Sequence, residues 1–89
     1  MKVLVEENKK EGLMALMGKN VTLFGMNYIY HGKLVGVNET CVKLSNPSIV
    51  YETGKFSEKG FKDIQSLETE NWYVGIGSIE SFGVLDAKE

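Results

Sequence analysis

The sequence predicts a mainly β protein in which a short N-terminal α-helix precedes a strongly bent five-stranded antiparallel barrel. Apolar residues alternate at period two in several short runs, turn residues separate these runs, and one stretch near the beginning has helical spacing instead. We expect residues 1–89 to form one domain, with the helix at about 6–17, the barrel at about 19–85 and an insertion loop at about 52–70.

Residues 28–44 organise the predicted sheet, because they form two extended runs around a short polar break. A three-residue loop at 38–40 sets Leu34 opposite Leu44 and keeps the apolar positions of the two runs together. A shift by one residue would set an apolar position against a lysine. We therefore predict a hairpin with this register.

Two glycines, Gly32 and Gly36, fall on one face of the first run of this hairpin. Glycine inside a strand marks a bend or a place where another backbone comes close. The same register places Gly36 opposite Val42. We expect the strand to curve at these two glycines.

The predicted helix is supported by Leu13, Leu16 and Met17, which recur at helical spacing before Gly18. We interpret it as a lid on one end of the barrel rather than as a membrane helix or a partner-binding helix. Residues 3–5 fit either a strand or an arm.

The other strands are predicted at 21–24, 48–51, 72–76 and 79–85. Residues 45–47 are either a break or a bulge at a sheet edge, since proline cannot donate to a ladder. In the insertion, Phe61, Ile64 and Leu67 could form a short helix, but the surrounding mixed charges favour a solvated loop.

The charge balance restricts the functions that this chain can have. The net charge is -2, the sequence pI is about 5.4, and all ten basic residues are lysines. Proteins that bind duplex nucleic acid usually present a basic surface, and arginine is the best side chain for bidentate phosphate or guanine contacts. Any binding of nucleic acid therefore has to depend on local geometry.

No catalytic or metal-binding arrangement is predicted. The lone Cys41 excludes an internal disulfide and a multi-cysteine zinc site, and it lies roughly 20 Å along the predicted hairpin from His31. No acidic cluster has the spacing of a calcium loop. We expect no enzymatic activity, no cofactor and no metal, and we interpret most aromatic residues as core or interface residues rather than a stacking platform, namely Tyr28, Tyr30, Phe56, Trp72 and Tyr73.

No apolar run approaches the roughly twenty residues that a membrane helix needs. The first residues contain too short an apolar stretch for a secretory signal. Together with the single cysteine, these features lead us to expect a cytoplasmic protein without a membrane partner.

The order of several short motifs resembles the Sm/Lsm family, which includes bacterial Hfq. Residues 21–23 resemble the start of the first Sm motif, and the run G-K-L-V-G-V-N at 32–38 resembles its second strand. Residues 44–46 and 50–54 resemble the third strand, and 75–79 fall where the second motif would lie.

This resemblance implies a homo-oligomeric ring, which we expect to contain about five to seven subunits. In the family, the fourth strand of one subunit pairs with the fifth strand of the next. The last two predicted strands are apolar and carry little charge, so as free edges they would favour strand addition. The residues expected at this interface are Trp72, Val74, Ile76, Ile79, Phe82 and Val84.

The resemblance also implies single-stranded RNA as a partner, bound by pore loops at Asn38, Glu39, Thr40, Gly77 and Ser78. However, the family's stacking residue, its asparagine and its arginine fall at Thr40, Val42 and Gly75 or Ile76, which lack those side chains. Asn38 aligns with the aspartate that orders the family's loop. The family resemblance favours an RNA-associated Sm-like ring. The acidic balance, the missing arginine and the lost stacking residue favour the alternative, an adaptor ring that holds a protein partner through the 52–70 insertion or the helix face.

Overall fold

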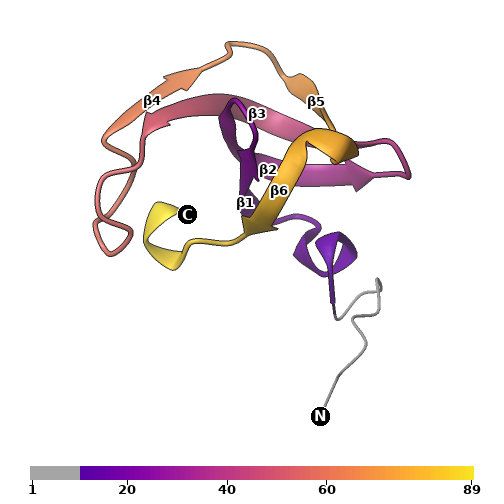
Figure 1. The fold of residues 1–89 in the computed structure, drawn as a ribbon, viewed down its shortest axis with the longest axis horizontal. Helices are drawn as coiled ribbons and strands as arrows, with labels where there is room; N and C mark the ends of the chain where they lie inside the picture. The colour runs from indigo at the N-terminus through magenta and orange to yellow at the C-terminus, as the bar shows by residue number, and fades with distance from the viewer. Residues whose placement is uncertain (1–10) are drawn as a thin grey trace.

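The computed structural model describes residues 11–89, which form six β-strands and three 3-10 helices. Figure 1 shows one strongly curved sheet with the short helices beside it. The elements are η1 (Leu13–Leu16), β1 (Asn20–Gly25), β2 (Ile29–Val37), β3 (Cys41–Glu52), β4 (Asp63–Ser66), β5 (Asn71–Gly75), η2 (Ile76–Ser78), β6 (Ile79–Gly83) and η3 (Asp86–Lys88). The prediction of a mainly β, antiparallel protein is confirmed, but there are six strands instead of five.

The strands form one open antiparallel sheet in the order β4-β3-β2-β1-β6, and β5 pairs with β3 alongside β4. The long strand β3 therefore has β2 on one side and two successive short strands on the other. β6 forms one edge of the sheet, and β4 and β5 together form the other.

The core lies on the concave side of the sheet and follows the alternation of its strands. Two alternating side chains of β1, one of β2 and two alternating side chains of β3 are completely buried, and the core cluster is completed by η1 and β5. Burial of an aliphatic side chain of this size stabilises a fold by about 1.5 to 3 kcal/mol. The cluster consists of Leu13, Val21, Leu23, Leu34, Leu44, Val42 and Val74.

The register of the β2–β3 hairpin is confirmed at its centre and wrong near its loop. Leu34 pairs with Leu44, as predicted, and the loop is the three residues 38–40. Gly36 pairs with Lys43 instead of Val42, because a bulge between Leu34 and Gly36 shifts the ladder by one residue. The bulge lets Val37 face Val42 on the core side, so the local irregularity increases apolar contact.

The bend at Gly32 has the physical cause that was predicted. A Cβ atom at this position would lie 3.1 Å from the carbonyl oxygen of Ser45 and 3.3 Å from Cα of Pro47. Only glycine lets the two backbones approach this closely without displacing one of them.

Residues 45–47 form a bulge within a continuous strand. Asn46 has a φ of 51°, and the side chain of Pro47 is fully buried. The position is not at a sheet edge, because β3 is paired on both sides. On the side of β3 away from β2, the pairing partner changes here from β4 to β5. Leu67 N donates to Pro47 O at 3.0 Å, and Asn46 N donates to Glu70 O at 3.1 Å.

The predicted helix at about 6–17 is not found in the part of the chain that the structure describes. Residues 6–10 and the possible strand at 3–5 lie outside that part. Within it, Gly12 has a φ of 72° and a ψ of -163°, which no α-helix accommodates, and only the 3-10 helix η1 follows. Leu13 of η1 nevertheless packs into the core.

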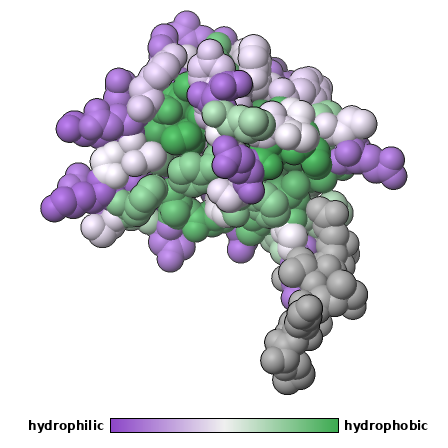
Figure 2. Space-filling model, in the orientation of Figure 1, coloured by the Kyte–Doolittle hydropathy of each residue, from purple (hydrophilic) through white to green (hydrophobic). Residues whose placement is uncertain are grey.

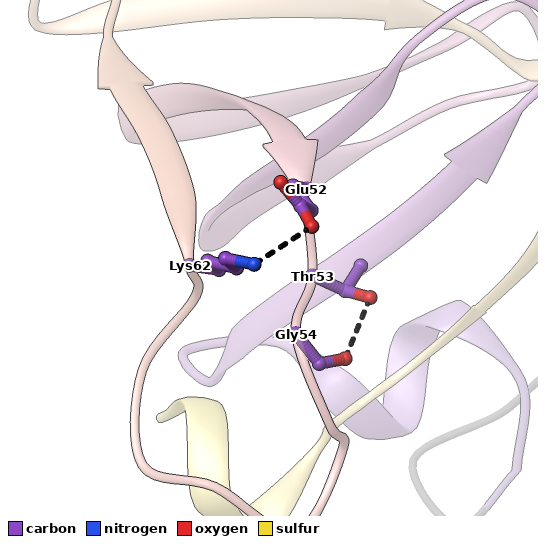
Figure 3. Close-up of polar contacts among 4 residues, drawn as sticks. All are labelled: Glu52, Thr53, Gly54 and Lys62. Atoms are coloured by element: carbon purple, nitrogen blue, oxygen red, sulfur yellow. Dashed lines mark hydrogen bonds and ion pairs between the residues drawn. The ribbon is translucent and has the colours of Figure 1, made fainter.

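The predicted insertion at 52–70 is shorter than expected, because residues 63–66 form β4. Ile64 pairs with Val50 of β3, so neither a short helix nor a solvated loop describes this segment. The remaining loop, 53–62, is closed at its base by an ion pair of 3.2 Å between Lys62 and Glu52 (Figure 3). Both side chains are exposed, so this pair contributes little to stability.

The 53–62 loop and η3 are bound to each other rather than free in solvent. The side chain of Lys88 is only 3% exposed, and its ammonium group donates to the carbonyl oxygens of Lys55, Glu58 and Gly60. In return, Gly60 N donates to Ala87 O at 3.0 Å. The C-terminal residues 86–89 therefore anchor the loop.

The anchored loop covers the second face of β1 and β2. The ring of Phe61 lies 5.0 Å, centroid to centroid, from the imidazole of His31 on β2, and Phe56 contacts Phe24 on β1 at 6.4 Å. Thr22, on this face, is 1% exposed. The sheet is therefore covered on both sides around Thr22 and His31.

Candidate functional site

The 38–40 loop is ordered by the side chain of Asn38. Its Oδ1 accepts hydrogen bonds from Thr40 N at 2.8 Å, from Thr40 Oγ1 at 3.0 Å and from Cys41 N at 2.9 Å. The backbone N–H of Asn38 also donates to Cys41 O at 2.9 Å. An amide that folds back on the two following residues fixes a tight turn and its exposed backbone. Asn38 therefore holds the loop in one conformation.

The two predicted loops, 38–40 and 77–78, lie side by side. Ile76 N donates to Thr40 O at 2.9 Å, and at the other end of η2 Met26 N donates to Ser78 O at 3.2 Å. Ser78 Oγ closes the turn by donating to Gly75 O at 2.8 Å. The structure thus brings together the residues that the sequence singled out.

These contacts show how strongly β2 is bent. Its nine residues would span about 30 Å if straight, yet the chain segments at its two ends both bond to the three residues of η2. Three residues of a 3-10 helix rise only about 6 Å. η2 therefore holds the sheet in a tight curl and places the two turns at one end of it.

An exposed aromatic residue and a lysine lie beside the 38–40 loop. Tyr73 of β5 pairs with Lys43 of β3, and the Lys43 ammonium lies 5.8 Å from the centroid of the Tyr73 ring. The neighbouring pair, Val42 and Val74, is buried, so Lys43 and Tyr73 point away from the core. Sequence reasoning missed Lys43; its alternation with buried Val42 and Leu44 was the available signal.

A hollow of about 240 Å³ lies at this pair. Lys43 and Tyr73 form one part of its lining, and the 38–40 hairpin forms the rest. The lining residues are Gly36, Val37, Asn38, Cys41, Lys43 and Tyr73. The hollow therefore combines an aromatic face, a cation and a polar loop.

The aromatic residues predicted for the core or an interface are mostly on the surface of the described chain. Only Tyr30 packs against the core, where its ring also lies 6.2 Å from that of Tyr28. The exposed ones are Tyr28, Phe56, Trp72 and Tyr73. Their exposure leaves them available to a second molecule.

The residues predicted for a subunit interface occupy three kinds of environment. Val74 belongs to the core, so a charge at this position would act on folding. Trp72 and Phe82 are exposed on β5 and β6, whereas Ile76, Ile79 and Val84 are partly buried against the core. Figure 2 shows hydrophobic side chains gathered in the middle of the face on which β1 and β6 cross the view, with hydrophilic ones around the outline.

His31 and Cys41 do not form a pair. His31 lies opposite Ser48 on β3, whereas Cys41 begins β3 and lies opposite Gly75. The Nδ1 atom of His31 shares a hydrogen bond of 3.0 Å with the hydroxyl of Thr22, and burial lowers the pKa of the imidazole from its usual 6.5. His31 is therefore a structural residue of the covered sheet face.

Within residues 11–89, no group of three or more His, Cys, Asp or Glu side chains is arranged to hold a metal ion. In the same part of the chain, no helix has the length and apolar character needed to cross a membrane.

Fold and site together define a small antiparallel β protein with a curled open sheet, whose two turns and exposed tyrosine–lysine pair lie at the same end. Comparison with protein-family models and with curated proteins gave no match for this sequence. The functional interpretation therefore depends on the motifs and on the geometry described above.

Proposed function

We propose that this chain is the subunit of an Sm-like homo-oligomeric ring of about five to seven copies that binds single-stranded RNA. The observation that carries this proposal is the position of the two edges of the sheet that residues 20–83 form. The family resemblance implies that the last strands occupy opposite edges and pair between subunits. β6 and the β4–β5 segment occupy opposite edges here.

Along β5, the backbone N–H groups point alternately toward β3 and away from it. This alternation identifies the groups that a neighbouring subunit could pair with. Ile76 N bonds to Thr40 O, and Asn46 N bonds to Glu70 O, so even-numbered residues of β5 face β3. The N–H groups of Tyr73 and Gly75 consequently point away from β3, to the outer edge of the described sheet. An edge strand of this kind is a template for strand addition.

The RNA part of the proposal is supported by the contact of the 38–40 loop with η2 and by the exposed ring of Tyr73 beside that loop. Asn38 orders its loop in the way that the resemblance implies for the family's aspartate. The family's stacking side chain and arginine are replaced at Thr40 and Ile76, so one subunit supplies weak contacts. A ring multiplies such contacts, because each bound nucleotide raises the effective concentration of the next.

Assembly is tested with two variants of Gly75. Its φ of -64° matches that of proline, and a Cβ atom there would have only the Ser78 hydroxyl within 4 Å. Gly75→Pro removes the outward N–H and places the pyrrolidine ring at the edge, while Gly75→Ala keeps the N–H. We expect native mass spectrometry to show rings for wild type and Gly75→Ala, and monomers for Gly75→Pro with an unchanged circular dichroism spectrum. A stable wild-type monomer at micromolar concentration contradicts the ring.

RNA binding is tested by titrating labelled oligo-U and oligo-A into wild-type rings at low and physiological salt. Phosphate contacts release counterions, so we expect measurable binding at low salt that weakens steeply as salt rises. If intact rings bind neither oligomer at low salt, the RNA proposal is wrong.

The second candidate is an adaptor ring that holds a protein partner, and the exposed apolar residues around the 53–62 loop favour it. Tyr51 and Phe56 are 57% and 55% exposed beside a loop whose shape Lys88 fixes. Point variants suit this test, because deleting the loop would also remove the partners of Lys88. Phe56→Ser should abolish capture of a partner that Lys59→Met retains.

A further inference from the structure

We propose that the hollow at Lys43 and Tyr73 is a nucleotide-binding site in which a nucleobase stacks on the Tyr73 ring. This inference rests on the proposed RNA function and adds residues that the family resemblance does not supply. Those two residues provide an aromatic face and a cation, which are the two elements missing at Thr40 and Ile76.

The first reason is the accessibility of the Tyr73 ring. It is 60% exposed on the face opposite the core, and β-strand side chains stand perpendicular to their sheet. Addition of a neighbouring strand at the β5 edge would use the backbone of Tyr73 and leave the ring open above the sheet. The site is therefore compatible with the ring assembly.

The second reason is the position of Lys43. Its ammonium lies 5.8 Å from the ring centroid, near the outer limit for a cation–π contact, on a flexible stem. A base stacked on Tyr73 places its phosphate within reach of this group. Opposite Lys43, Gly36 has no side chain, and a Cβ atom there would lie 3.3 Å from Lys43 Cβ, so glycine keeps the hollow open.

The third reason is the amide of Asn38, which also lines the hollow. Its Oδ1 is used by the loop, whereas its Nδ2 forms no hydrogen bond with any residue from 11 to 89. This donor is held rigidly because the same amide orders the loop. It is available to an acceptor atom on the edge of a base.

The site is tested by measuring the affinity of wild type and variants for a labelled oligo-U by fluorescence anisotropy. Tyr73→Leu removes the aromatic face but keeps an apolar, strand-compatible side chain, and Tyr73→Phe keeps the face. Tyr51→Leu is the matched control, since Tyr51 is similarly exposed at the far end of β3. We expect Tyr73→Leu to weaken binding at least about 5-fold, because base stacking has that minimum effect, and the other two variants to bind like wild type.

Lys43→Met gives an independent readout, with exposed Lys19 as the control position. Loss of one phosphate contact per bound site reduces the slope of log affinity against log salt by about 0.7, whereas Lys19→Met should leave it unchanged. Circular dichroism and native mass are measured for every variant, so that loss of folding or assembly is recognised.

The outcomes separate this site from the broader proposal. If wild type binds RNA and Tyr73→Leu binds equally well, the nucleotide site is wrong and RNA binding elsewhere on the ring stands. Equal weakening by Tyr73→Leu and Tyr51→Leu also overturns the site. If intact wild-type rings bind no RNA, the proposed function and the site fail together.

Discussion

The ammonium group of Lys88 lies 5.3 Å from the centroid of the Phe61 ring, and its hydrogen bonds to three backbone carbonyls tie the 53–62 loop to η3. A lysine this deeply buried that has no carboxylate partner among residues 11–89 is uncommon. Here backbone dipoles and an aromatic face replace water around the charge.

Replacing Lys88 by methionine should lower the free energy of unfolding by about 1 to 3 kcal/mol, because buried carbonyls then lose their donor. Urea unfolding measures this change. Lys59→Met, in the exposed part of the same loop, is the control and should have little effect. Equal stability of the two variants would show that the carbonyl contacts are not what anchors the loop.

Stability should decrease as the pH falls below about 6.5, the usual pKa of the single histidine in the sequence. Burial lowers the pKa of His31 in the folded protein, so in this window the unfolded chain binds more protons and folding is disfavoured. Urea unfolding at several pH values between 7.5 and 5 measures the slope. His31→Asn should flatten it, and an unchanged slope in that variant would assign the effect to other groups.

Gly32→Ala should destabilise the fold by about 1 to 2 kcal/mol, because the new methyl group meets the backbone of the β3 bulge on two atoms. Gly83→Ala is the matched control, since no heavy atom lies within 4 Å of the added Cβ. That substitution should be neutral or stabilise by up to about 1 kcal/mol. Thermal unfolding compares the two, and equal melting temperatures would contradict the close approach.

Asn38→Asp should preserve stability, whereas Asn38→Ala should lower it by about 1 kcal/mol, because only aspartate keeps the oxygen that accepts from Thr40 and Cys41. Both changes remove the free Nδ2 donor. If that donor contacts a base, both variants should bind oligo-U more weakly than wild type. Equal stability of the two variants would argue against the role of Asn38 in ordering the loop.

The β2–β3 hairpin could be predicted because its information is local. The period-two alternation and the polar loop determined the pairing of Leu34 with Leu44. The bulge at Gly36 could not be predicted, because it depends on which of two nearly equivalent pairings gives Val37 the better apolar contact.

The strand β4 was missed because its four residues are exposed and show no alternation, so only pairing with β3 makes them a strand. The role of Lys88 was missed because its partners lie 28 to 33 positions away. At the candidate site, the residues of the 38–40 loop and Gly77 and Ser78 were identified from the sequence. The outward direction of Tyr73 and Lys43 was not, because it follows from the register of β3 with β5.

The hydrogen bonds that η2 makes to Met26 and Thr40, on either side of β2, have a consequence for the shape of any polymer of this chain. If neighbouring chains join through β5 and β6, the curl fixed by η2 sets the angle and rise between successive copies. A head-to-tail contact closes into a ring only when that rise is zero, and otherwise it continues as a helical fibre. If the wild type forms such rings, loosening the contact between Thr40 and Ile76 should change this rise and give filaments, which electron microscopy would show.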